Sequence, residues 1–188
     1  MSRSGVRTWV VAAAMLGTLL VARHAAALSL ITFRAPHAVR APVARLDSAL
    51  QKDLDVQARA TDLEPLDELV AFALRATSRV LRFGLSHRTR LTFDGVEREG
   101  NCVEYAELFA SIVNRERGSA DVRAWVVRSD AEILGETAKS PALKDHDWVL
   151  VVAHTPDGTR RLYVDPTLYD MGLGWDISGV VLGDVRSP

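Results

Sequence analysis

The 188-residue sequence has little of what several common classes of protein require. It holds a single cysteine, Cys102, so no disulfide can form within the chain and a cysteine-rich zinc site is excluded. It also has no excess of one charge, since 23 Lys and Arg residues face 24 Asp and Glu residues. Because the arginines are spread along the chain and give no basic surface, we expect no nucleic-acid partner.

The composition fits one ordinary globular domain. Hydrophobic residues make up 48% of the sequence and charged residues 25%. The chain shows no internal repeat and no low-complexity tract. These proportions allow a buried core and argue against a disordered, collagenous or repeat protein.

The N-terminal segment has the layout of a secretory signal peptide. Arg3 and Arg7 precede an uncharged stretch over residues 9–22, and three alanines end at Ala27. The stretch is shorter than the roughly 20 apolar residues of a membrane-spanning helix. We therefore expect residues 1–27 to be a signal peptide or, if uncleaved, an N-terminal membrane segment. The protein is then expected to be exported, to the periplasm or the extracellular space, with membrane contact only through this segment.

Residues 28–43 differ in composition from the rest of the chain. Pro36 and Pro42 alternate with small and basic residues there, which predicts a linker. Residues 44–188 are then expected to form the globular domain.

Helical spacing of apolar residues marks three segments of this domain. The first expected helix begins near Leu46. The second follows a cap at Thr61 or Asp62 and ends at Gly84, and the third begins at Cys102 and ends at Gly118. The helices thus dominate the first half of the domain.

Strand-like runs dominate the second half. They cover residues 122–127, 148–152 and 161–164, and a short strand is expected over 89–93. The turn from Thr155 to Gly158 joins the last two long runs into a hairpin. If Thr155 lies opposite Gly158, the register places Asp165 opposite Trp148 and about one diagonal from His146.

Cys102 stands where a catalytic cysteine would be expected. A cysteine attacks as the thiolate, so its pKa must fall from about 8.5, and a helix N-terminus together with an imidazolium is the usual means. Cys102 follows Gly100 and Asn101 at the start of a predicted helix, whose free N–H groups can also bind an oxyanion. Taken alone, however, a single cysteine is more often a small, inert, buried residue.

Two further residues favour the catalytic interpretation. His146 begins an apolar strand, and Asp165 ends the neighbouring strand of the hairpin. A carboxylate there can hold one ring nitrogen of the imidazole and leave the other for a thiol, which is the role of the third member of a triad. A metal site built on Asp145, His146 and Asp147 is disfavoured, because the acids alternate with the histidine across the strand.

Three motifs in order resemble the transglutaminase-like superfamily. The run from Gly100 to Phe109 looks like its Gly-x-Cys helix, His146-Asp147-Trp148-Val149 like its His-x-Trp-Val motif, and Asp165-Pro166-Thr167 like its Asp-Pro-Thr motif. The separations of 44 and 19 residues suit that family, and the resemblance covers about residues 66–176. It implies a papain-like α+β fold, in which N-terminal helices and a cysteine-bearing helix pack on an antiparallel β-sheet.

The resemblance also implies an activity on amide bonds of proteins or peptides. Cys102 would attack an amide carbonyl to give a thioester, His146 would pair with the thiolate and protonate the leaving amine, and Asp165 would orient His146. Such an enzyme is a cysteine acyltransferase or a peptidase or amidase. The sequence shows no calcium-binding loop pattern, so we expect no metal, and we expect no cofactor. The family's second oxyanion donor, a tryptophan upstream of the cysteine, has no counterpart in the predicted domain; His87 and Asn101 are candidates that no pattern favours.

Some alternatives remain open at this point. A relative without activity, which keeps the fold as a binding or scaffolding module, would show the same motifs. Residues 128–145 either border the cleft or form a surface excursion. Glu104 and Glu107 are expected on an exposed helix face, Asp147 and His154 in solvent, Trp125 and Trp148 in the sheet core, and Tyr105 in the core or a pocket wall.

Overall fold

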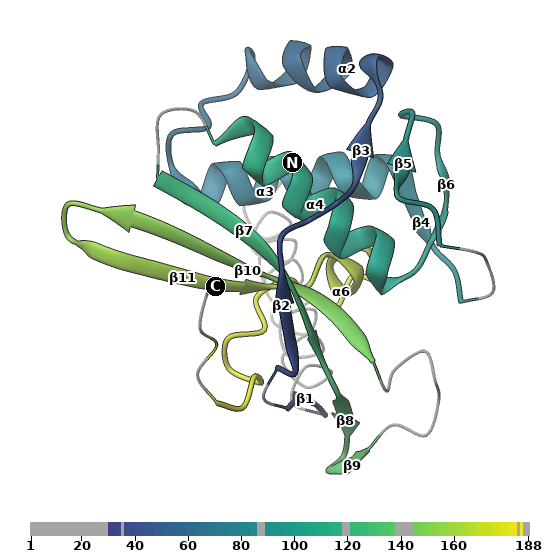
Figure 1. The fold of residues 1–188 in the computed structure, drawn as a ribbon, viewed down its shortest axis with the longest axis vertical. Helices are drawn as coiled ribbons and strands as arrows, with labels where there is room; N and C mark the ends of the chain where they lie inside the picture. The colour runs from purple at the N-terminus through teal and green to yellow at the C-terminus, as the bar shows by residue number, and fades with distance from the viewer. Residues whose placement is uncertain are drawn as a thin grey trace, which may run out of the picture.

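A four-stranded antiparallel sheet with helices on one face organises the molecule (Figure 1). The computed structural model describes residues 30–34, 36–85, 89–117, 121–137, 145–183 and 185. The expected signal segment, 1–27, lies outside the described residues, as does His87. In spatial order the strands are β11 (Gly158–Val164), β10 (His146–Thr155), β7 (Asp121–Ser129) and β2 (Ala38–Arg40).

The central strand β10 is covered on both faces because its residues are apolar almost throughout. Val149 and Val151 point toward the helices, whereas Trp148 and Leu150 point to the opposite face. On that opposite face they pack with Phe33 and with residues of the C-terminal segment. An uninterrupted apolar run is what a strand buried on both faces requires.

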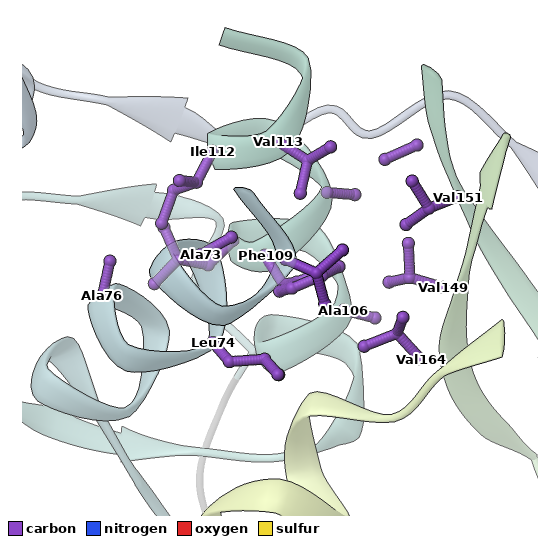
Figure 2. Packing of buried hydrophobic residues seen from close by; sticks show 14 of the residues in the cluster. Ala73, Leu74, Ala76, Ala106, Phe109, Ile112, Val113, Val149, Val151 and Val164 are labelled. Carbon is purple, nitrogen blue, oxygen red and sulfur yellow. The ribbon is translucent and has the colours of Figure 1, made fainter. Parts of the chain in front are cut away.

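The helical layer is centred on α4 (Cys102–Glu116), which packs on β7 and β10. Phe109 and Val113 of α4 face Val149 and Val151 of the sheet (Figure 2). The opposite side of α4 packs on α3 (Leu66–Val80), whose apolar face is also buried. The described residues also form α2 (Ser48–Ala58) and α6 (Pro166–Asp170). In the described part of the chain, no helix is long and apolar enough to cross a membrane.

Short strands outside the main sheet pair with one another. Three small sheets are formed: β1 (Ile31–Phe33) with β8 (Ala131–Ile133) and β9 (Glu136–Thr137); β3 (Arg45–Leu46) with β5 (Thr92–Phe93); and β4 (Leu81–Phe83) with β6 (Arg98–Gly100). The last two pairs are parallel. β6 leads directly into α4 and therefore fixes where that helix begins.

Gly100 is required for this junction because of space. A Cβ atom at Gly100 would lie 2.9 Å from Cδ2 and 3.3 Å from Cδ1 of Leu81, on the paired strand β4. Leu81 is itself buried, with 1% of its surface exposed. The glycine of the Gly-x-Cys motif thus allows β4 and β6 to approach closely just before α4.

Several sequence predictions are confirmed. The protein is a mixed α+β protein whose main sheet is antiparallel. Helix α4 begins at Cys102 as expected, and the hairpin has the expected register, with Thr155 opposite Gly158 and Val149 opposite Val164. The three long strands exist, although each extends beyond its predicted bounds.

Two predictions are wrong. The second helix was expected from a cap at Thr61 or Asp62 to Gly84, but α3 runs from Leu66 to Val80 and Leu81–Phe83 is a strand. The linker expected over residues 28–43 instead supplies β1, which pairs with β8, and β2, which pairs with β7. In both places pairing with distant strands decides the local structure, and helical spacing or proline content does not reveal such pairing.

Candidate active site

Cys102 is the first residue of α4 and is nearly buried, with 8% of its surface exposed. Asn101 and Glu104 form a capping box at this end of the helix. The Asn101 side-chain oxygen accepts a hydrogen bond from the Val103 N–H (3.0 Å), and the Asn101 N–H donates to Glu104 Oε2 (3.1 Å). These bonds fix the helix start, so Cys102 sits in the first turn at the positive end of the helix dipole.

His146 and Asp165 form a buried hydrogen-bonded pair. His146 Nε2 lies 2.6 Å from Asp165 Oδ2, and 7% of the His146 side chain and none of Asp165 is exposed. An ionised carboxylate can only accept, so Nε2 carries the proton and donates it in this bond. Cys102 is among the groups that raise the pKa of the same ring, after Asp165. Because Asp165 occupies Nε2, Nδ1 is the nitrogen left for the sulfur.

The environment holds His146 in its protonated form. Burial by itself lowers the pKa of His146 by disfavouring the charged ring. The charge of Asp165 and the hydrogen bonds with Asp165 and Cys102 outweigh burial and raise that pKa well above its usual value. Phe33 stacks on the ring, with 5.3 Å between the ring centroids and 26° between the planes. The imidazolium is therefore fixed in orientation and shielded from water.

Asp165 has a second structural role that limits its movement. It is the N-cap of α6, and its Oδ1 accepts hydrogen bonds from the N–H groups of Thr167 (2.9 Å) and Leu168 (3.1 Å). One carboxylate oxygen thus caps a helix while the other holds His146. Since the capped helix begins at Pro166, the motif Asp-Pro-Thr holds the carboxylate at the end of β11.

Tyr105 connects the helix that carries Cys102 to the helix that Asp165 caps. Its hydroxyl donates a 2.5 Å hydrogen bond to Asp170 Oδ2 at the end of α6. Tyr105 is completely buried, so it belongs to the core. Burial, together with the hydrogen bond and the charge of Asp170, raises the pKa of the Tyr105 hydroxyl far above its usual value, so it remains a donor.

A network of buried charges lies beside these residues. Asp147 accepts two hydrogen bonds from Arg128, to Oδ1 (2.6 Å) and Oδ2 (3.1 Å), and one from Arg40 (2.9 Å). Arg40 also pairs with Glu107 of α4. Glu107 Oε2 accepts from the N–H groups of Val43 (2.7 Å) and Ala44 (3.2 Å). The network joins β2, β7, β10 and α4.

This network corrects the expectation that Glu107 and Asp147 are solvated. The side chains of both residues are completely buried, and each is paired with Arg40. Glu104 is also buried, with 1% exposed, and Oε1 accepts from the Arg90 N–H (2.9 Å). Helical and strand periodicity failed here because buried carboxylates occupy positions that the pattern assigns to polar, exposed residues.

The three expected catalytic residues therefore come together, and the other candidates do not join them. Asn101 uses its side-chain oxygen to cap α4. Trp148 is core, and His154 lies exposed at the far end of β10, as expected. Residues 128–145 were expected either to border the cleft or to form a surface excursion. Residues 128–137 contain the end of β7 and strands β8 and β9, and residues 138–144 lie outside the described residues. In the described ranges, no group of three or more His, Cys, Asp or Glu residues could hold a metal ion.

Sequence reasoning did not single out Arg40 and Arg128. One signal was available for Arg128: on a hairpin-like pair of strands it lies opposite Asp147, and opposite charges at facing positions indicate an ion pair. Arg40 gave no such signal, because its strand could not be recognised in a segment that contains two prolines.

Comparison with known proteins gives no relative. No protein-family model matches the chain, no curated protein is similar to it, and no solved structure matches its fold. What the site does must therefore be argued from its own geometry.

Proposed function

We propose that this protein is a transglutaminase-like cysteine enzyme that acts on amide bonds of proteins or peptides. In this proposal the fold is a papain-like arrangement, with the nucleophile on a helix and its two partners on an antiparallel sheet. Cys102 is the nucleophile, His146 the acid and base, and Asp165 the residue that orients His146.

One observation carries the proposal: the buried ring of His146 is held by Asp165 at 2.6 Å, and Cys102 is among the groups that raise the pKa of that ring. A cysteine that is merely a buried apolar residue needs no such partners. The thiol also lies at a capped helix N-terminus, where a negative sulfur is favoured. Nucleophile, base and orienting group within hydrogen-bond reach are the signature of covalent catalysis.

The chemistry follows from these positions. The Cys102 thiolate adds to the amide carbonyl carbon and forms a tetrahedral oxyanion. The imidazolium of His146 gives the Nδ1 proton to the leaving amine, the C–N bond breaks, and a thioester remains on the sulfur. Water or an acceptor amine, deprotonated by neutral His146, then attacks the thioester and releases Cys102. Water gives hydrolysis and an amine gives acyl transfer; neither route needs a cofactor.

The proposal includes export from the cytoplasm, and it rests there on the layout of residues 1–27 alone. Cell fractionation followed by N-terminal sequencing checks this part. An N-terminus near residue 28 in an exported fraction agrees with a cleaved signal peptide. A protein that stays cytoplasmic with residue 1 intact contradicts it.

Alkylation of Cys102 by iodoacetamide across pH 5 to 9 tests the proposed catalytic pair. We expect the wild type to react rapidly below pH 7, because the proposed mechanism requires an activated sulfur beside His146. The variant His146→Ala should lose most of this reactivity below pH 7. His154→Ala is a matched control, since His154 lies exposed on the same strand, far from Cys102.

If the wild type and His146→Ala react alike at every pH, Cys102 is not activated and the enzyme proposal fails. The protein would then be better described as a module that keeps the fold for binding or scaffolding.

A further inference from the structure

Arg128 is the charged group of the site that the proposed triad does not use. Its side chain is 36% exposed, while the Asp147 carboxylate that holds it is fully buried. Asp147 binds Nε and Nη2 of the guanidinium, so the plane of the group is fixed. Nη1 has no hydrogen-bond partner among the described residues. Arg128 is thus a donor of fixed orientation whose Nη1 group is available to bind another acceptor.

The position of α4 on the sheet brings this donor to the Cys102 end of the helix. Asn114, near the other end of α4, binds the backbone of Ala124 on β7 through both atoms of its side-chain amide (2.8 and 2.9 Å). Glu107 is bound through Arg40 to Asp147, which lies opposite Arg128. The helix therefore runs antiparallel to β7, with Glu107 at the level of Arg128. Cys102 lies five residues further along, about 7.5 Å at 1.5 Å per residue, a distance that an arginine side chain can span.

Strand alternation places Arg128 on the face of the sheet that α4 covers. Arg128 shares its face of β7 with Ala124 and Val126, which pack in the cluster that contains α4. The hydrogen bond with Asp147 raises the pKa of Arg128 against the effect of burial, and the charges of Asp147, Asp145 and, last, Cys102 add to this.

We propose that Arg128 is the second oxyanion donor of the site, acting together with the backbone N–H of Cys102 at the start of α4. This inference rests on the proposed function and supplies the group that the sequence did not reveal. When the thiolate adds to a carbonyl, negative charge moves from sulfur to the carbonyl oxygen. A fixed guanidinium N–H with no other partner can receive that charge without rearrangement.

The network around Arg128 argues for this role over recruitment of an anionic substrate. Arg40 and Arg128 are balanced by Glu107 and Asp147, so the cluster has no surplus positive charge to attract a carboxylate. A transient oxyanion needs an aligned donor, not a net charge. The ion pair with Asp147, which Arg40 also binds, holds the donor in alignment.

Two probes separate this role from the others. p-Nitrophenyl acetate acylates a catalytic cysteine: the sulfur–carbon bond forms through an oxyanion, the carbon–oxygen bond breaks, and p-nitrophenolate leaves as the anion. Iodoacetamide alkylates the same sulfur by displacement of iodide at a methylene carbon, with no oxyanion. A second oxyanion donor should therefore matter for the first reaction and not for the second.

The experiment measures both rate constants for the wild type, Arg128→Gln and Arg123→Gln. Arg123 is a matched control, an exposed arginine on the same strand. We expect Arg128→Gln to slow acylation about 100-fold and to leave alkylation within about twofold of the wild type. Arg123→Gln should change neither rate. If Arg128→Gln does not fold, Arg128→Lys keeps a cation for Asp147 and should slow acylation about 10-fold or more.

Two results would overturn the inference. Equal losses in acylation and alkylation would mean that Arg128 acts on the thiolate or on the fold, and unchanged rates would mean that it does not act at all. Failure of the proposed function is visible separately, because His146→Ala would then alkylate like the wild type.

Discussion

The two ends of the interface between α4 and the sheet bury their side chains in different ways. Toward the C-terminal end of α4, Phe109 and Val113 pack on Val149 and Val151 in one apolar cluster (Figure 2). Toward the N-terminal end, the same helix and strands bury Glu107 and Asp147 with the arginines that pair with them. The interface between α4 and the main sheet therefore contains both the main apolar contact and the candidate site.

The difference shows how stability and chemistry are divided along one helix. Apolar contacts tolerate small shifts, because burial stabilises without directional demands. A buried carboxylate is tolerated only if each of its oxygens finds a donor, so the polar end has one arrangement that satisfies it. That arrangement holds Cys102, His146 and Asp165 in register. The following substitutions test this division, beginning with the largest expected effect.

Phe109→Ala removes the largest side chain at the apolar end. Phe109 is completely buried, and we expect the free energy of unfolding to fall by about 3–5 kcal/mol. Urea denaturation followed by circular dichroism measures the loss. Val56→Ala, at a position 62% exposed on α2, is the control and should change it by less than about 0.5 kcal/mol. A similar cost for both variants would show that the apolar end does not dominate stability.

Asp147→Asn removes the negative charge at the polar end without changing shape. Arg40 and Arg128 lose their shared partner, and because each arginine is 36% exposed, the expected loss is about 2–3 kcal/mol, less than for a fully buried pair. The control is Asp67→Asn, since the Asp67–Arg160 pair is exposed and should contribute less than about 1 kcal/mol. Equal losses in urea denaturation would contradict the importance of burial at this end.

Gly100→Ala tests the junction that positions Cys102. The added methyl group would lie 2.9 Å from Leu81, so we expect a loss of about 1–3 kcal/mol from overpacking. Gly179→Ala is the matched control, because a Cβ there meets nothing within 4 Å. Thermal unfolding compares the two. If Gly100→Ala unfolds like Gly179→Ala, close approach of β4 and β6 is not what requires the glycine.

The pH dependence of stability tests the His146–Asp165 pair. Asp165 raises the pKa of His146 above its unfolded value of about 6.5. The stabilisation is therefore fully present below pH 6.5 and is lost as pH rises toward the folded pKa, by up to about 1.4 kcal/mol per pH unit. Urea denaturation from pH 6 to 9 should show this fall in Cys102→Ser, where the thiol no longer titrates.

Cys102→Ser/Asp165→Asn is the companion variant for this measurement. Asparagine can still cap α6, but it lacks the charge that holds the imidazolium. The fall in stability between pH 6 and 9 should shrink in the double variant. An unchanged slope would assign the pH dependence to other groups.

Local patterns in the sequence were sufficient for much of the site. The hairpin turn at Thr155–Gly158 fixed the register of two strands, and that register brought Asp165 to His146. The helical spacing of apolar residues after Gly100 and Asn101 predicted the start of α4 at Cys102. In each case the signal and the structure lie within a few residues of each other, or across one tight turn.

Contacts between distant segments could not be predicted in this way. Arg40 lies 67 residues from Glu107 and 107 from Asp147, and no periodicity connects them. The buried state of Glu104, Glu107 and Asp147 depends on such partners. Equally, the end of α3 at Val80 depends on the pairing of β4 with β6.

The sequence by itself determined the α+β class, the helix that begins at Cys102 and the hairpin that joins His146 to Asp165, because turn chemistry, capping and periodicity act locally. Only the tertiary structure decided that residues 31–33 and 38–40 belong to the sheets and that two buried carboxylates hold Arg40 and Arg128 beside the site. The physical reason is that a charged side chain is polar in any sequence pattern. Its burial is permitted only by partners that the folded chain brings from far away.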